Sequence, residues 1–131
     1  MYQKAILFKD TKIAQEILET GHPRKVKELG RKVSGFSTEA WEPHREKIVY
    51  KGNLLKVTKP VNTKEGNEGE DLLAKLLETG DRELVEASPY DRIWGIGFTA
   101  ADAEENRERW GSNLLGKALM EVRKTLREAQ S

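Results

Sequence analysis

Apolar residues recur along the first half of the chain at intervals of three and four positions, a spacing that predicts helices with one buried face. Four segments have this pattern: Tyr2 to Phe8, a segment capped by Asp10 that stops at Gly21, Pro23 to Leu29 with Gly30 as its terminator, and about Trp41 to Val57 after Ser37 or Thr38. In the fourth segment Pro43 falls in the first turn, where a helix tolerates proline. We therefore expect the first half to be helical.

The second half mixes helical and irregular patterns. Leu72, Leu73, Leu76 and Leu77 mark a short amphipathic helix, and Leu115, Leu119, Val122 and Leu126 mark a longer one from about Asn113 to Ala129. The best strand candidate is Leu84 to Ala87, and Trp94 to Phe98 also looks extended. Residues 58–68 have turn-forming chemistry and predict a surface loop. The fold class that follows is mainly α-helical, or α+β at most with a small sheet, in a single compact domain.

Composition fits one small domain with a thin core and a highly charged surface, since 37% of the 131 residues are hydrophobic and 34% are charged. The net charge of +1 argues against a broad nucleic-acid surface, so any such contact would be local. Without Cys, and with His only at 22 and 44, neither a disulfide nor a metal site is expected. No apolar run has the length of a membrane span. We expect an intracellular, cytoplasmic protein with no membrane partner and no cofactor.

The segment from Ser88 to Arg123 concentrates residues suited to a ligand site. It holds two of the three Trp, four of the eleven Gly and the carboxylate of Asp91. Glycine lets backbone approach a ligand closely, and a tryptophan ring can stack on a base or a sugar. These residues together suggest a nucleotide-like ligand with Asp91 beside it.

The same segment resembles the signature of the NADAR (YbiA-like) family. An Asp-x-x-Trp-Gly element beginning at Asp91 is followed by Gly-x-Asn-x-Leu-Gly from Gly111 and by Leu-Met-x-x-Arg ending at Arg123. Further matches lie upstream: Tyr2-Gln3-Lys4-Ala5, Gly30-Arg31, Trp41, His44-Arg45, Thr79-Gly80-Asp81 and Leu84-Val85-Glu86. The resemblance covers most of the chain. It implies a single NADAR-like domain over residues 1–131.

The resemblance further implies an N-glycosidase that cleaves a phosphorylated ribose from a base or amine nitrogen. Two substrates represent that class: ADP-ribosyl-guanine in nucleic acid, and a phosphoribosylamino-pyrimidine of riboflavin synthesis. Family members carry an additional N-terminal part of a few tens of residues, including a Glu two helical turns before the Gln-Lys pair. In this chain that Glu would fall before Met1, so we expect the domain to be N-terminally short.

Two catalytic residues follow from the resemblance. Composition alone makes Lys4 a solvated helix residue, but the family's Gln-Lys position makes it the candidate nucleophile, which would form a Schiff base with ribose. Its pKa would have to fall for the amine to attack. Asp91 is either a turn residue that caps local N–H groups or, as the family motif favours, an acid/base group at the ribose.

Substrate-binding candidates are the residues Trp41, Trp94, Gly95, Arg31, Lys51, Arg109 and Asn113. The tryptophans are core residues by default, and the resemblance places Trp94 against the ligand and Trp41 at the pocket wall. Trp110 is assigned to packing. Asn113 is either an N-cap or part of a phosphate cradle at the turn of residues 110–113. The three basic residues are surface charges or phosphate contacts.

An alternative from another functional class stays open. The chain could be a non-catalytic module that binds ADP-ribose-like ligands, inactive because the N-terminal segment with its Glu is missing. The sequence does not distinguish the substrates, and it gives no indication of oligomeric state.

Overall fold

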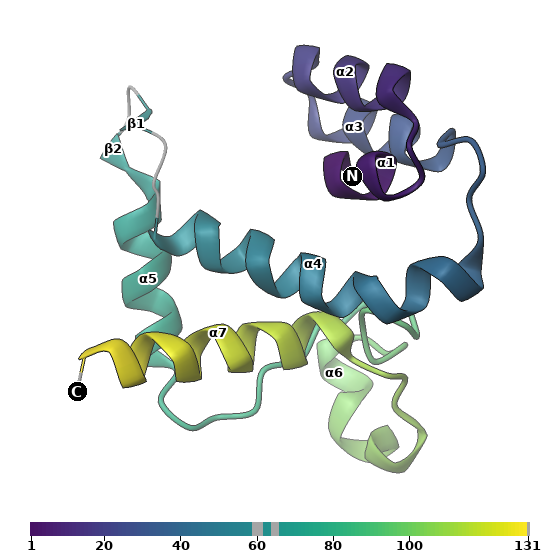
Figure 1. The fold of residues 1–131 in the computed structure, drawn as a ribbon. Coiled ribbons are helices and arrows are strands. Elements are labelled where there is room, and N and C mark those ends of the chain that lie inside the picture. The colour runs from purple at the N-terminus through teal and green to yellow at the C-terminus, as the bar shows by residue number, and fades with distance from the viewer. Residues whose placement is uncertain (59–61, 64–65, 131) are drawn as a thin grey trace. The chain divides into compact units, whose positions relative to one another are not determined.

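The computed structural model describes residues 1–58, 62–63 and 66–130, and the chain divides into two compact units, Met1–Ile48 and Val49–Ser131 (Figure 1). The described residues are mainly helical, as predicted. Helix α4, Thr38–Thr58, begins in the first unit and ends in the second. No helix in the described part of the chain is both long enough and apolar enough to span a membrane.

The first unit is built on three short helices, α1 (Tyr2–Leu7), α2 (Thr11–Glu19) and α3 (Pro23–Arg31), which pack on one another (Figure 1). Their apolar faces bury a small core of Ala5, Ala14, Ile17, Leu29 and Val33. The cap predicted at Asp10 is present, because Asp10 Oδ1 accepts a hydrogen bond of 3.1 Å from the Ile13 N–H. The helical periodicity therefore predicted this unit correctly.

Gly30 is not the helix terminator that the sequence suggested. It is a buried residue inside α3, which continues to Arg31. A Cβ at this position would collide with the side chain of Met1, so the absence of a side chain lets the chain start pack against α3. Gly21, by contrast, lies beyond the end of its helix, because α2 ends at Glu19 and its C-cap is Thr20 in an extended conformation.

Helix α4 begins close to its predicted boundary. The Ser37 hydroxyl accepts a hydrogen bond of 3.4 Å from the Ala40 N–H, and Pro43 lies near the helix start. Gly52 lies within the helix and is exposed. The helix ends at Thr58, one residue after the predicted end.

The second unit contains α5 (Glu68–Glu78), α6 (Ala100–Ala103), the 3₁₀ helix η1 (Glu104–Arg109) and α7 (Leu114–Gln130). Its core joins Val57 at the end of α4, Leu76 on α5 and Val122 on α7. The leucine patterns predicted both α5 and α7. The helices α6 and η1, which lie in a polar stretch, were not predicted from the sequence.

The predicted strands are wrong. Leu84 to Ala87 and Trp94 to Phe98 have no ladder partner and form irregular backbone. The pairing that the structure describes joins two-residue strands, β1 (Asn62–Thr63) and β2 (Gly66–Asn67), in antiparallel register. These strands fall inside the predicted loop of residues 58–68, of which 59–61 and 64–65 lie outside the described residues.

Candidate active site

Lys4 has its side-chain amine fixed between a backbone carbonyl and two aromatic rings. The amine donates a hydrogen bond of 2.8 Å to the Gly30 carbonyl near the end of α3. Its Nζ lies 4.4 Å from the ring centre of Phe36 and 5.8 Å from the ring of Trp41. These contacts place the amine beside aromatic faces rather than in open solvent.

Burial lowers the pKa of Lys4 below its ordinary value of 10.5, because the partly enclosed amine loses water that would stabilise its charge. The carbonyl and the rings favour the charged form, so their effect opposes that of burial. Burial has the larger effect, so the pKa of Lys4 is lowered and the neutral amine is favoured. A neutral amine can still donate one N–H to Gly30 while its lone pair remains free to attack.

Phe36 borders the Lys4 amine, although no sequence pattern singled it out. It is 44% exposed and packs with a tilted ring against Phe8, with ring centroids 5.3 Å apart. Gly35, immediately before it, has a φ of 71°, so the backbone turns sharply there. An aromatic residue in a glycine turn just before a helix, in a chain with few aromatics, is the sequence signal that could have revealed it.

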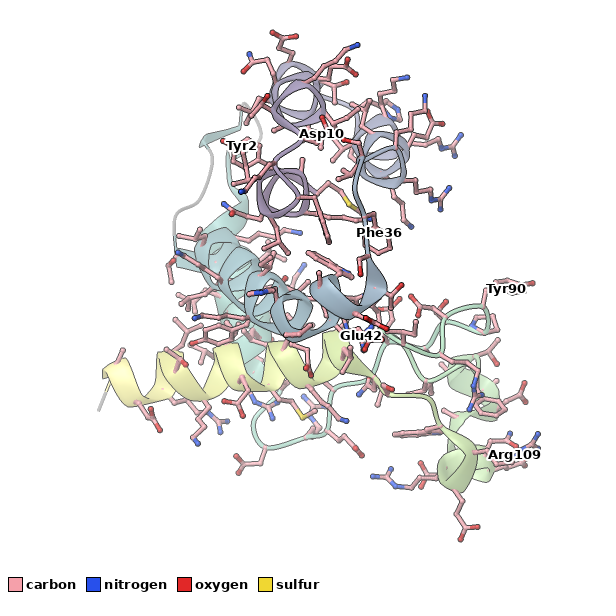
Figure 2. The ribbon with its side chains drawn as sticks, turned by 45° about the vertical axis from the view of Figure 1, so that its right-hand side comes forward. Tyr2, Asp10, Phe36, Glu42, Tyr90 and Arg109 are labelled. Carbon is pink, nitrogen blue, oxygen red and sulfur yellow. The ribbon has the colours of Figure 1, made fainter. Side chains whose placement is uncertain are left out.

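Asp10 anchors the segment that carries Phe36. Its Oδ2 accepts hydrogen bonds from the backbone N–H of Ser34, at 2.9 Å, and from the Ser34 hydroxyl, at 3.0 Å. These bonds, led by that of the Ser34 N–H, hold the pKa of Asp10 below its usual value. The cap of α2 thus also fixes the turn of residues 34–36, as the labelled Asp10 and Phe36 in Figure 2 allow the reader to follow.

The remaining candidates of the first unit are Trp41, half-buried in the first part of α4, and Arg31, exposed in the last turn of α3. Trp41 contributes the second ring near Lys4. Lys51, in the part of α4 that belongs to the second unit, is exposed. The exposure of Arg31 and Lys51 fits an ordinary surface charge as well as a phosphate contact.

Asp91, in the second unit, caps a turn of the backbone. Its Oδ1 accepts hydrogen bonds from the N–H groups of Ile93, at 3.0 Å, and Trp94, at 2.9 Å. This is the turn reading of Asp91 that the sequence left open. Both bonds use the same oxygen, so Oδ2 is not engaged in them.

The backbone after Asp91 pairs with the chain that leads into α7. Five successive N–H groups, from Gly111 to Leu115, donate to carbonyls between Arg92 and Ile96 at 2.8 to 3.1 Å. The two motifs therefore lie side by side through backbone hydrogen bonds. Gly95 is buried in this pairing, where a side chain would meet the carbonyls of Asp91 and Glu86.

Asn113 is a buried clamp rather than part of a phosphate cradle. Its Oδ1 accepts from the Glu86 N–H at 3.0 Å, and its Nδ2 donates to the Leu84 carbonyl at 2.9 Å. Its φ of 50° is left-handed, a conformation that Asn tolerates. The N–H groups of residues 111–113 donate to backbone carbonyls, so they are not free to hold a phosphate as the cradle alternative requires.

Gly116 allows the Asn113 side chain to reach the backbone of Leu84 and Glu86. A Cβ at Gly116 would collide with the Leu84 carbonyl and the Asn113 amide, so glycine brings the chain of residues 84–86 directly against α7. The residues Leu84 to Glu86 are thus held by side-chain bonds and helix contact, which explains why they do not need a β-ladder.

Other motif residues also stabilise the second unit. Trp94 is half-buried, and Trp110 donates from its indole N–H to the Ala103 carbonyl at 2.7 Å, which agrees with its assigned packing role. The buried Arg123 donates to the Thr79 hydroxyl at 2.7 Å and the Arg82 carbonyl at 2.9 Å. Arg109 is exposed beside Phe98.

A separate hollow of about 420 Å³ lies between α4, α5, the segment of residues 84–86 and α7, with mainly apolar walls. None of the predicted catalytic or substrate-binding residues lines it. Within the described ranges, no three His, Asp or Glu side chains gather as metal ligands.

Comparison with known proteins relates nearly the whole chain to one family. The sequence model of the NADAR domain matches residues 1–127, which include most of both units. An N-glycosidase of Acanthamoeba polyphaga mimivirus is 44% identical over 94% of this chain and 68% of its own length. The protein irg-1 of Caenorhabditis elegans is 39% identical over 96% of this chain and 57% of its own, and an N-glycosidase of Nostoc punctiforme is 32% identical over 98% and 71%.

Proposed function

The chain belongs to the NADAR domain family, and we propose that it is a hydrolase that cleaves the N-glycosyl bond between a phosphorylated ribose and a base or amine nitrogen. Two relatives that match almost all of this chain are named as N-glycosidases, which supports the reaction class. The single observation that supports a mechanism is the amine of Lys4, partly desolvated, bonded to Gly30 and bordered by Phe36 and Trp41.

Lys4 is the proposed nucleophile. Its neutral amine attacks C1′ of the ribose, the C1′–N bond breaks, and the electron pair leaves with the base or amine nitrogen. The proton lost by Nζ balances the proton that this nitrogen gains. The nitrogen lone pair then opens the ring at O4′, which takes up a proton, and leaves a protonated imine between Nζ and C1′. Water adds to the imine, releasing the ribose aldehyde and regenerating the amine.

The surroundings of Lys4 suit this chemistry in two ways. Burial lowers its pKa, which raises the fraction of neutral amine at neutral pH. The bond to Gly30 restricts the side chain, so less orientational freedom is lost when the amine attacks. Trp41, half-buried and near the amine, is the proposed wall for the sugar or base.

Asp91 is the proposed acid/base residue of the second unit, with Trp94 and Gly95 as substrate-binding neighbours. The Oδ1 bonds to the N–H groups of Ile93 and Trp94 fix the carboxylate and leave Oδ2 outside the turn. A carboxylate held in this way can exchange a proton at the leaving nitrogen and stabilise positive charge at C1′.

Borohydride trapping tests the proposal. The chain is incubated separately with an oligonucleotide that carries ADP-ribosyl-guanine and with the phosphoribosylamino-pyrimidine, and borohydride is added during turnover. We expect release of the base or amine from one substrate and a reduced ribose-derived adduct on Lys4, located by mass spectrometry.

Lys4→Arg should lose both the cleavage and the adduct, because its guanidinium stays protonated. Lys27→Arg, a change at an exposed lysine on α3, is the matched control and should retain both. Unimpaired cleavage by Lys4→Arg would exclude the covalent mechanism. Binding of both substrates without cleavage of either would favour the binding-module alternative.

A further inference from the structure

Arg92 and Arg109 place their guanidinium groups on the same aromatic ring. The guanidinium carbon of Arg92 lies 6.0 Å from the ring centre of Phe98, and that of Arg109 lies 5.9 Å from it. Both arginines are exposed, whereas Phe98 is half-buried. Two positive charges therefore share one ring at the surface of the second unit.

The backbone is arranged to hold Arg92 in this position. Its Nη2 donates a hydrogen bond of 2.7 Å to the carbonyl of Arg109, which ties the two residues together. Gly97 has a φ of 81°, and a Cβ there would lie 2.7 Å from Cγ and 2.9 Å from Nη1 of Arg92. Only a residue without a side chain accommodates this backbone conformation and the arginine lying across it.

No carboxylate neutralises either guanidinium within the part of the chain that the structure describes. This is notable because η1 carries Glu104, Glu105 and Glu108 close in sequence to Arg109. Arg107 on the same helix differs, since it pairs with Glu83 and stacks on Trp110 at 4.7 Å. Arg107 is thus a neutralised arginine on an aromatic ring, and the other two are not.

The two guanidinium groups carry the same charge and contact the same ring, so they repel each other, and an anion that binds both of them reduces that repulsion. The planar N–H donors of Arg match the oxygens of phosphate, which makes phosphate the favoured anion. Tyr90, two residues before Arg92, is 96% exposed and projects outward in Figure 2, where a base could stack on its ring. An exposed aromatic ring close in sequence to Arg92 favours a nucleotide over a simple anion.

We propose that Arg92 and Arg109, supported on Phe98, form a binding site for the phosphate groups of a nucleotide or a nucleic-acid strand. Because the net charge of the chain is only +1, such binding depends on this local arrangement rather than on a general attraction to anions. Arg109 was already a candidate phosphate contact, and the proposed site adds Arg92 as a second contact and Phe98 as their support. It concerns binding and does not require N-glycosidase activity.

Titration with two unreactive probes tests the site. Binding of ADP is measured by calorimetry. Binding of a fluorescent twelve-residue thymidine oligonucleotide without terminal phosphates is measured by anisotropy. For the probe that binds, we expect Arg109→Gln to weaken affinity about tenfold, as loss of a charge-assisted contact does. Arg109→Glu should abolish binding, because its carboxylate would pair with Arg92. For the oligonucleotide, Arg109→Gln should also reduce the salt dependence of binding.

Arg107→Gln is the matched control, since it removes the same charge from the same helix but leaves both guanidinium groups on Phe98. Arg92→Gln removes the other guanidinium group and also the hydrogen bond to the Arg109 carbonyl, so its effect on affinity is compared with that of Arg109→Gln. Selective loss of ADP binding identifies a free nucleotide as the ligand, and selective loss of oligonucleotide binding identifies a strand. Equal weakening by Arg107→Gln, wild-type affinity of Arg109→Glu, or no binding of either probe by the unchanged chain would overturn the proposal.

Discussion

The side-chain amine of Lys4 donates a hydrogen bond of 2.8 Å to the backbone carbonyl of Gly30, 26 residues further along the chain. This bond joins α1 to α3 and brings together two motifs that the sequence separates. Gly30 contributes in two ways. Its carbonyl accepts the hydrogen bond from the amine, and its lack of a side chain leaves space for the side chain of Met1. The candidate nucleophile is therefore positioned by a helix that does not carry it.

The lowered pKa of Lys4 predicts that its amine reacts at lower pH than an exposed lysine. When an amine-acylating reagent is applied over a pH series, Lys4 should be modified at lower pH than the exposed reference Lys27, because the neutral amine is the reacting form. Mass spectrometry of the digested protein measures both sites in one sample. Modification of Lys4 only at higher pH than Lys27 would contradict the effect of burial.

The same pKa shift has a defined sign for stability. A lysine whose pKa falls on folding binds fewer protons in the folded state than in the unfolded state. Its contribution to the free energy of unfolding therefore rises with pH between the lowered pKa and the ordinary value of 10.5. Lys4→Met should remove this part of the pH dependence in denaturant titrations.

Asp10→Asn separates the two tasks of Asp10. Asn is also a good N-cap, so the bond to the Ile13 N–H can persist, but an NH₂ group in place of Oδ2 cannot accept from Ser34. We expect a fall of about 4 °C in Tm by calorimetry and a change in the acylation rate of Lys4, because the turn carrying Phe36 is released. Ser34→Ala, which keeps its backbone N–H, should have the smaller effect on both readouts.

Acid should act in the same direction as Asp10→Asn. The bonds to Ser34 and Ile13 hold the pKa of Asp10 below its usual 3.8, so its stabilising effect is present above that value. The effect is lost as the pH falls through the lowered pKa. A chain carrying Asp10→Asn should lack this acid-dependent loss in a thermal melt series.

Asp91→Asn should distinguish proton transfer from turn capping. Asn retains an oxygen that can accept from the N–H groups of Ile93 and Trp94, so Tm should stay near that of the unchanged chain. Cleavage should nevertheless slow by about 100-fold, since the amide cannot exchange the proton. Asp91→Ala removes both functions and should lower Tm as well. Full activity of Asp91→Asn would exclude the acid/base role.

Asn113→Ala should destabilise the second unit. It leaves the Glu86 N–H and the Leu84 carbonyl without their partners and places alanine at a φ of 50°, for a cost of about 3 kcal/mol in urea unfolding. Ser112→Ala changes an exposed neighbour and is the matched control. Equal stability of the two variants would show that the clamp contributes little.

Repeating apolar positions were enough to predict most helices, since α1, α2, α3, α4, α5 and α7 each bury one face and that requirement is written in local spacing. Segments without such spacing were misjudged. Leu84 to Ala87 has the composition of a strand, but Asn113 and the room made by Gly116 satisfy its backbone without a ladder. That choice depends on a partner nearly thirty residues away, which local propensity does not contain.

The sequence by itself determined the family, the residue types available for chemistry and the cap at Asp10, because these follow from order and local bonding. Only the tertiary structure decided which of those residues face one another. Phe36 became a neighbour of Lys4 through a turn fixed by Asp10, and Phe98 became the common support of Arg92 and Arg109. The physical reason is that burial, pKa and charge pairing depend on distances between side chains, and folding sets those distances between residues far apart in the chain.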